Sequence, residues 1–217
     1  MVSSADPEGP VRPSADSREV AVRAYVESVR RCLAAATGAI HRDYYLLPMQ
    51  DSGTAYRERT YCYELYHQMK AHWPSDLADA QYELGGEVDK AGHRWFAHQT
   101  LRNKKPDLLV HDPGDMEKNL VVIEVKAVTA RRAQIRADLQ KLTAFCGRGK
   151  YSRAFYLLYG YQGVRVDRIL KMSATLAEGN RTINLSQIDF YWHAGPEQPA
   201  KLVGWGLTSE PRRRRQD

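Results

Sequence analysis

One segment, Leu120 to Ala127, constrains the fold more than any other part of the sequence. It reads LVVIEVKA and is apolar on both faces, which is typical of a strand at the centre of a sheet. Glu124 and Lys126 interrupt this pattern two residues apart, so both side chains project from the same face of the strand. Burying a carboxylate and an ammonium group is unfavourable unless they are paired, hydrated or bound to a metal ion. The segment therefore predicts a central strand that carries a polar site.

A second apolar strand precedes this one along the chain. It begins at Pro106-Asp107, continues through Leu108-Leu109-Val110, and is followed by the turn-forming residues Asp112-Pro113-Gly114-Asp115. So short a connection predicts antiparallel pairing, which would bring Asp107 alongside Glu124, seventeen positions later. Two carboxylates in one cleft repel each other, and a divalent cation that prefers oxygen ligands, Mg²⁺ or Mn²⁺, relieves the repulsion.

The hydrophobic pattern on either side of these strands predicts a single α/β domain. Apolar residues at helical spacing predict helices over Glu19 to Gly38, about 55 to 73, about 131 to 146, and Val166 to Ala177. Further extended segments are predicted at Gln81 to Val88, Ala154 to Tyr159 and Ile188 to His193. The order strand, helix, strand after Leu120 indicates a crossover connection. The predicted fold class is α/β, with a central mixed sheet flanked by helices.

The ends of the chain and two other segments have the composition of irregular structure. Residues 1–17 are rich in Pro, Ser, Gly and Asp and predict a flexible leader, and residues 206–217 predict a basic flexible tail. Residues 18–205 are then one domain with helices at its N-terminal end. Pro48 and Asp51-Ser52-Gly53 indicate a linker, and from Gly195 onward Pro, Gly and charged residues predict no regular element.

Composition excludes several classes of protein. No apolar run approaches the roughly 20 residues that span a bilayer, and no secretory signal is readable, so we expect a cytosolic protein that does not bind membranes. Cys32, Cys62 and Cys146 form no CxxC pair and predict neither a disulfide framework nor a zinc site. The net charge is +6, but the tail contributes half of it through Arg212–Arg215 and Asp217. The mildly basic remainder does not by itself indicate a nucleic-acid partner.

Two motifs taken together, KKPDLLVH at Lys104–His111 and IEVK at Ile123–Lys126, resemble the PD-(D/E)xK or restriction-endonuclease-like nucleases. The resemblance covers about 57 to 160, roughly half of the chain. It implies a restriction-endonuclease-like core and phosphodiester hydrolysis that depends on Mg²⁺, with Mn²⁺ as an alternative. Asp107 and Glu124 would be metal ligands, the carbonyl of Val125 a further ligand, and Lys126 the catalytic lysine.

The resemblance also indicates which partners to expect, and two alternative functions are considered beside it. DNA is favoured over RNA as the substrate, and a homodimer is one arrangement that it allows, since many such nucleases pair to cut both strands. Neither a P-loop nor a GxSxG motif is present, so nucleotide hydrolysis and esterase chemistry have no support. One alternative is an inactive nuclease-like module that binds nucleic acid or a protein partner. Another is an interaction protein in which Glu124 and Lys126 form an ordinary ion pair.

A third acid, upstream of the two strands, is less well determined. The resemblance favours Glu64, within YELYHQ, and we take Glu64 as the predicted catalytic acid. Helix geometry instead favours Glu58, because Glu64 falls nearly opposite the apolar stripe of its helix and Glu58 falls within it. Glu87, after Gly85-Gly86, is a further alternative.

Several other polar residues are interpreted as structural. His111 shares a strand face with Asp107 and could reach the cleft, although a partly buried structural histidine is the favoured interpretation. Asp138 and Lys141 are interpreted as a helix-surface pair at i,i+3. Nucleases of this type often turn that helix toward the substrate, which gives Gln134, Gln140 and Lys141 a secondary claim to the site.

Overall fold

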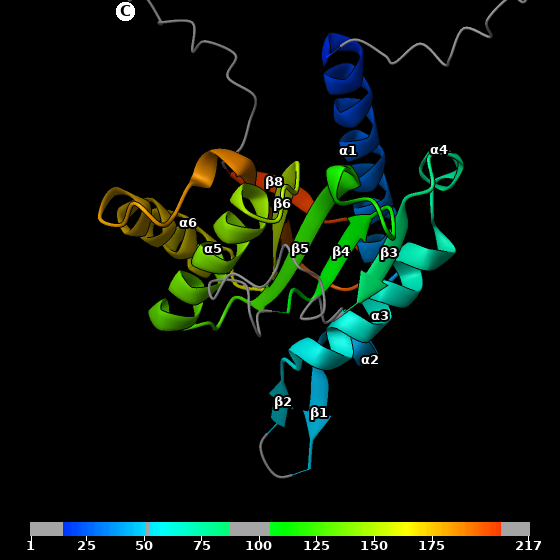
Figure 1. Cartoon of the computed structure of the whole chain (residues 1–217). Coiled ribbons are helices and arrows are strands. Elements are labelled where there is room, and N and C mark those ends of the chain that lie inside the picture. Colours follow the sequence, from blue (N-terminus) through cyan, green and yellow to red (C-terminus); the bar gives the residue numbers. More distant parts are fainter. Residues whose placement is uncertain (1–14, 51–52, 87–104, 205–217) are drawn as a thin grey trace, which may run out of the picture.

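The sheet of the protein is built around β5 (Asn119–Ala127), all nine residues of which are buried. The structure, a computed structural model, describes residues 15–50, 53–86 and 105–204. In these ranges six strands form one sheet in the order β3-β4-β5-β6-β7-β8 (Figure 1). The other five strands are β3 (Glu83–Gly86), β4 (Leu108–His111), β6 (Arg153–Tyr159), β7 (Ile188–His193) and β8 (Lys201–Gly204). β5, β6 and β7 are parallel, and the remaining pairings are antiparallel.

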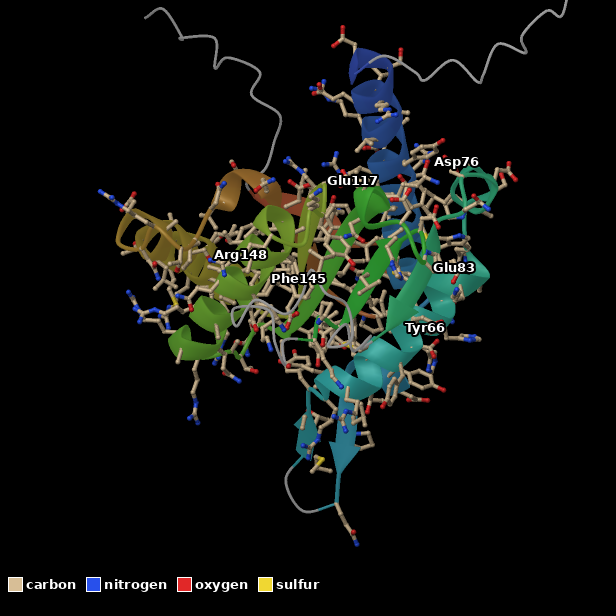
Figure 2. All side chains as sticks on the ribbon, in the orientation of Figure 1. Tyr66, Asp76, Glu83, Glu117, Phe145 and Arg148 are labelled. Atoms are coloured by element: carbon tan, nitrogen blue, oxygen red, sulfur yellow. The ribbon has the colours of Figure 1, made fainter. Side chains whose placement is uncertain are left out.

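Helices cover both faces of the sheet and make three layers (Figure 1). On one face, α1 (Ala15–Gly38), α3 (Glu58–Ala71) and α4 (Ser75–Asp79) pack against alternate β5 residues, including Ile123 and Val125. On the other face, α5 (Arg132–Gly147) and α6 (Gly163–Glu178) pack against Val122 of β5 and Leu109 of β4. Phe145 of α5 is buried between its helix and the sheet (Figure 2). Glu124 and Lys126 have the parity of Val122, so they lie on the α5 face, as the period-two argument predicts.

The principal elements predicted from periodicity are confirmed. β4 and β5 pair in antiparallel register, and α5 links β5 to the parallel strand β6 in a crossover. α3 and α5 occupy the predicted segments, with ends that differ by one to three residues. The mixed α/β class with a six-stranded sheet between helices therefore agrees with the sequence prediction. α1 begins at Ala15, so the last three residues of the predicted leader belong to it, while residues 1–14 and the basic tail lie outside the described residues.

Short elements occur where the sequence predicts irregular structure. The predicted linker contains β1 (Leu47–Met49) and β2 (Gly53–Ala55), which pair with each other, and α2 (Arg42–Tyr45) precedes them. β8 lies in the C-terminal region where no element is expected, and it pairs with β7 at the edge of the sheet. Strands of three or four residues are too short to show an alternating pattern, and they form here because a neighbouring strand supplies their hydrogen-bond partners. No helix among the described residues is long and apolar enough to cross a membrane.

A buried cluster of aromatic rings joins β7 to α2 and α3. His193, at the end of β7, is fully buried, and its Nδ1 lies 2.7 Å from the Tyr61 hydroxyl. Tyr45 donates a hydrogen bond to the His193 carbonyl at 2.8 Å. The Nε2 atom of His193 has no hydrogen-bond partner, and burial lowers the pKa of this imidazole to about 4. The histidine is therefore neutral in the folded protein at neutral pH.

This burial predicts a specific loss of stability in mild acid. The unfolded chain protonates His193 below its ordinary pKa of 6.5, whereas the folded protein resists protonation until about pH 4. Unfolding therefore becomes easier as the pH falls through this window, by up to roughly 3 kcal/mol. Urea unfolding measured from pH 7 to pH 4 should show this slope in the wild type. His193→Phe should remove this part of the slope, and an equal slope in both proteins would contradict the assignment.

Candidate active site

The site forms where β5 continues past the end of β4. Paired positions between the two strands end at Leu108 and Ile123, while β5 continues for four more residues beside β6. On the side of β5 that β4 no longer covers, two backbone N–H groups donate to side chains instead of to a neighbouring strand. The N–H of Val125 donates to Oδ2 of Asp107 at 2.7 Å, and the N–H of Ala127 donates to Oε1 of Glu58 at 3.2 Å. Two carboxylates from different parts of the chain are therefore held at the end of one strand.

Lys126 lies between carboxylates from two helices on opposite faces of the sheet. Its Nζ is 3.0 Å from Oε2 of Glu58 in α3 and 3.4 Å from Oδ2 of Asp138 in α5. Asp138 also accepts a hydrogen bond from the Tyr156 hydroxyl of β6 at 3.1 Å. Lys126 is 8% exposed, so these contacts hold its ammonium group in place.

Glu124 is the most deeply buried acid of the site. Its Oε1 lies 2.5 Å from Nζ of Lys141 in α5, and its Oε2 is buried without a hydrogen-bond partner. Lys141 also donates to the carbonyl of Lys105, just before the Pro106-Asp107 strand start, at 3.3 Å. The Lys141 ammonium group thus contacts both Glu124 of the central strand β5 and the segment that leads into β4.

Burial and mutual repulsion change the acidity of these groups. Burial raises the pKa of Asp107 above its ordinary value, although the Val125 N–H opposes that rise. Burial raises the pKa of Glu124 still further, and the nearby Asp107 carboxylate adds to the effect. Burial would lower the pKa of Lys126, but Asp138 and Glu58 outweigh it and the pKa is raised. The lysine therefore remains charged, while Lys141 offsets only part of the rise in the pKa of Asp107 and Glu124.

A pocket of about 530 Å³ opens beside the acids. Its lining residues come mainly from α3 and the start of β4, namely Glu58, Arg59, Cys62, Tyr63, Tyr66, Gly86, Asp107 and Leu108. On α3, Arg59, Tyr63 and Tyr66 are spaced at i, i+4 and i+7 and so follow one face of the helix. Tyr66 extends from α3 next to β3 in Figure 2. The pocket offers an aromatic and cationic wall next to Glu58 and Asp107.

The structure brings three of the four predicted site residues together. Asp107, Glu124 and Lys126 lie at the shared end of β4 and β5, as the sequence predicts. Glu64 accepts a hydrogen bond from Gln68, one turn along its own helix, at 2.7 Å. The upstream acid that contacts Lys126 is Glu58, the residue that helix geometry favours. The alternative Glu87 lies outside the described residues.

The interpretation of Asp138 and Lys141 as a solvent-exposed helix pair is wrong. Asp138 is 7% exposed, and each residue reaches a different partner on β5. The signal was present in the sequence, since Asp138 and Lys141 fall among Ile135, Leu139 and Leu142, the positions that face the core. A charged residue within the apolar face of a helix indicates a buried partner, and the lysine of the Glu-x-Lys strand was an available one.

The remaining secondary candidates lie away from the acids or have other partners. His111 is at the opposite end of β4, paired in register with Glu83 of β3. Gln134 accepts a hydrogen bond from the Arg131 N–H at the start of α5, and Gln140 donates to Thr182. Val125 contributes its N–H to the Asp107 contact, in addition to the ligand role that the resemblance implies for its carbonyl.

Comparisons of this chain with protein-family models, curated proteins and solved structures find no match. Within the described ranges, no three His, Cys, Asp or Glu side chains form a group arranged to hold a metal ion. The donor set nevertheless suits Mg²⁺, which is commonly held by one or two carboxylates and keeps several waters. Asp107 and Glu124 would provide these carboxylates, and Oε2 of Glu124 is buried without a hydrogen-bond partner.

The contacts of Lys126 predict that its removal destabilises the fold. Lys126→Met leaves Asp138 buried and Glu58 partly buried without their shared cation, which should lower the free energy of unfolding by roughly 3 kcal/mol. The matched control is Lys118→Met, because Lys118 pairs with Asp112 at the other end of the hairpin and is 42% exposed. Loss of that exposed pair should cost at most about 1 kcal/mol. Urea denaturation at neutral pH checks both values, and equal losses would contradict the difference in burial.

Proposed function

We propose that this protein is a metal-dependent nuclease that hydrolyses phosphodiester bonds, with DNA favoured over RNA as its substrate. The observation that carries the proposal is the buried Glu124 carboxylate, which has one oxygen without a partner and lies close enough to Asp107 for the two charges to repel. Lys141 offsets part of this charge through Oε1 of Glu124, but the second oxygen and the repulsion by Asp107 remain unfavourable in an apolar core. A divalent ion held by these two acids would satisfy both.

The charges of the site support the same conclusion. Four carboxylates lie near the end of β5, those of Glu58, Asp107, Glu124 and Asp138. The ammonium groups of Lys126 and Lys141 form ion pairs with three of them and act on Asp107 at longer range. With every group ionised, this cluster has two negative charges in excess. A single Mg²⁺ or Mn²⁺ ion would neutralise it.

In the proposed reaction, the protein's own residues bind and orient the substrate. Asp107 and Glu124 would hold the metal, which lowers the pKa of a bound water and stabilises charge on the phosphate. Lys126 keeps its proton because Asp138 and Glu58 stabilise the charged form. Its role is therefore to donate a hydrogen bond to the attacking water or a phosphate oxygen rather than to act as a general base.

The order of elements around the site also supports the proposal. After α3 and the short helix α4, the described part of the chain forms the antiparallel strands β3, β4 and β5, then α5 and the parallel strand β6. This order of helix, hairpin, helix and strand also looks like the core of the restriction-endonuclease-like nucleases, to which the motifs around Asp107 and Glu124 carry the resemblance. We therefore also propose that this α/β domain has a restriction-endonuclease-like core. It places the proposed ligands at the carboxyl end of β5, where open α/β sheets bind their ligands.

The pocket beside the acids is suited to a nucleic acid. Arg59 and Tyr63 are exposed on its wall, and Tyr63 is 63% exposed. Arginine contacts phosphate groups, and an exposed tyrosine ring stacks on unpaired bases. A strand bound along this face of α3 would pass next to Glu58 and Asp107.

A second candidate function is an inactive nuclease-like module that binds nucleic acid or a protein. Two observations favour it, the lack of a three-residue metal-ligand group in the described ranges and the contact between Glu124 and Lys141. Both functions predict binding of a partner, but only the nuclease requires a divalent ion at Asp107 and Glu124. Metal binding therefore separates the two.

Metal binding should raise the thermal stability of the protein. Millimolar Mg²⁺ or Mn²⁺ should increase the Tm by several degrees, because a ligand that binds only the folded state stabilises it by roughly 1 to 3 kcal/mol at concentrations well above its Kd. Asp107→Asn should abolish this increase, whereas Asp112→Asn, at the far end of β4, should retain it. Sodium chloride of equal ionic strength is the salt control. A Tm that does not respond to either metal would contradict the metal site.

Cleavage should depend on Glu124 and on Glu58 more than on Glu64. Incubation with single-stranded, duplex and branched DNA and RNA, with each metal, should reveal cleavage by the wild type. Glu124→Gln should lower the rate at least about 100-fold, since it removes stabilisation of transition-state charge. Glu58→Gln should also lower the rate, because Glu58 positions Lys126, while Glu64→Gln should remain close to wild type. A larger loss in Glu64→Gln than in Glu58→Gln would restore Glu64 as the upstream acid.

A further inference from the structure

We propose that Lys141 is an internal counterion. Its ammonium group pairs with the Glu124 carboxylate in the metal-free protein and leaves that carboxylate when a divalent ion binds. This inference rests on the proposed metal site and adds a regulatory step to it. Lys141 would then be released toward the substrate only in the metal-bound protein.

The first observation is the position of Lys141. It follows Asp138 by one helical turn, and both side chains extend from α5 to the end of β5. The Lys141 ammonium lies 2.5 Å from Oε1 of Glu124, and the Lys141 side chain is only 16% exposed. The ammonium group therefore lies close to the position that a metal ion bound to the same carboxylate would occupy.

The second observation is that the two lysines of the site have different numbers of partners. Lys126 contacts two carboxylates, Glu58 and Asp138, and these would still hold it after a metal ion bound to Glu124. Lys141 contacts one carboxylate, Glu124, and otherwise the neutral carbonyl of Lys105. A divalent ion on Glu124 would repel both ammonium groups, but Lys126 would keep both of its ion pairs, whereas Lys141 would lose its ion pair with Glu124 and keep only the longer-range attraction of Asp107 and Asp138. Lys141 is therefore the group that moves.

The third observation concerns where the released lysine would go. Lys141 has a flexible four-carbon stem, and its contact with Lys105 places it beside the chain that leads to Asp107. A phosphate group brought to the metal at Asp107 and Glu124 would add negative charge close to the released ammonium group. Exchange of Lys141 from Glu124 to the phosphate would therefore couple binding of the metal to binding of the nucleic acid.

The inference predicts that removing the ammonium group strengthens metal binding. Lys141→Met and Lys141→Gln should lower the Kd for Mn²⁺, measured by calorimetry in the absence of nucleic acid, by at least about tenfold. Lys141→Gln retains a hydrogen-bond donor for Glu124, so a gain in both variants identifies the charge as the cause. Lys118→Met removes one positive charge away from the site and should change the Kd less than about twofold.

A second measurement uses the wild-type protein and does not depend on the stability of a variant. Reductive methylation followed by mass spectrometry reports the accessibility of each lysine amine. The labelling rate of Lys141 should rise several-fold when Mn²⁺ is added, while that of Lys118 should stay the same.

The outcomes separate this inference from the proposed function. If the wild type binds Mn²⁺ but the Lys141 variants bind it no more tightly, or if the labelling of Lys141 does not change, the counterion exchange is wrong and the metal site stands. If neither the wild type nor the Lys141 variants bind Mn²⁺ or Mg²⁺, the metal site and the exchange both fail. Tighter binding in both variants together with faster labelling supports the exchange.

Discussion

The arrangement of the site depends on the hydrogen-bonding requirement of one strand end. β5 continues beyond its pairing with β4, and a buried backbone N–H group without a partner would destabilise the fold. Asp107 and Glu58 meet this requirement by accepting hydrogen bonds from Val125 and Ala127. The same contacts orient their carboxylates toward the end of the strand. The hydrogen bonds that satisfy the end of β5 are thus the same ones that bring the acidic side chains together.

The hydrophobic layers around this strand give the cluster its chemical character. Glu124 lies between buried sheet residues and α5, where water cannot screen its charge, and its repulsion by Asp107 is correspondingly strong. Lys126 is stabilised in its charged form by two acids, while Lys141 offsets part of the charge on Glu124. The site therefore has a fixed cation beside acids whose charges are only partly offset, and the proposed function assigns a metal ion to these acids.

Helices on opposite faces of the sheet are both needed to complete the cluster. α3 packs on the face of α1 yet brings Glu58 around the end of β5, and α5 supplies Asp138 and Lys141 from the other face. The two strands alone would provide Asp107, Glu124 and Lys126 without the contacts that hold the lysine. Positioning by packed helices gives a firmer arrangement than positioning by loops, because each side chain is held by neighbours in the core.

The local sequence pattern by itself determined the two central strands of this protein and the site residues that they carry. The apolar character of LVVIEVKA on both faces was enough to predict a buried central strand, and strand parity put Glu124 and Lys126 on one face. The short turn after the Pro106-Asp107 strand was enough to predict antiparallel pairing with Asp107 near Glu124. Tertiary structure decided which other charges joined them, namely Glu58 rather than Glu64, and Asp138 and Lys141 as buried partners. The reason is physical: strand parity and turn length act between near neighbours. The choice among acids on a helix depends on how that helix is rotated and positioned against a sheet formed by distant parts of the chain.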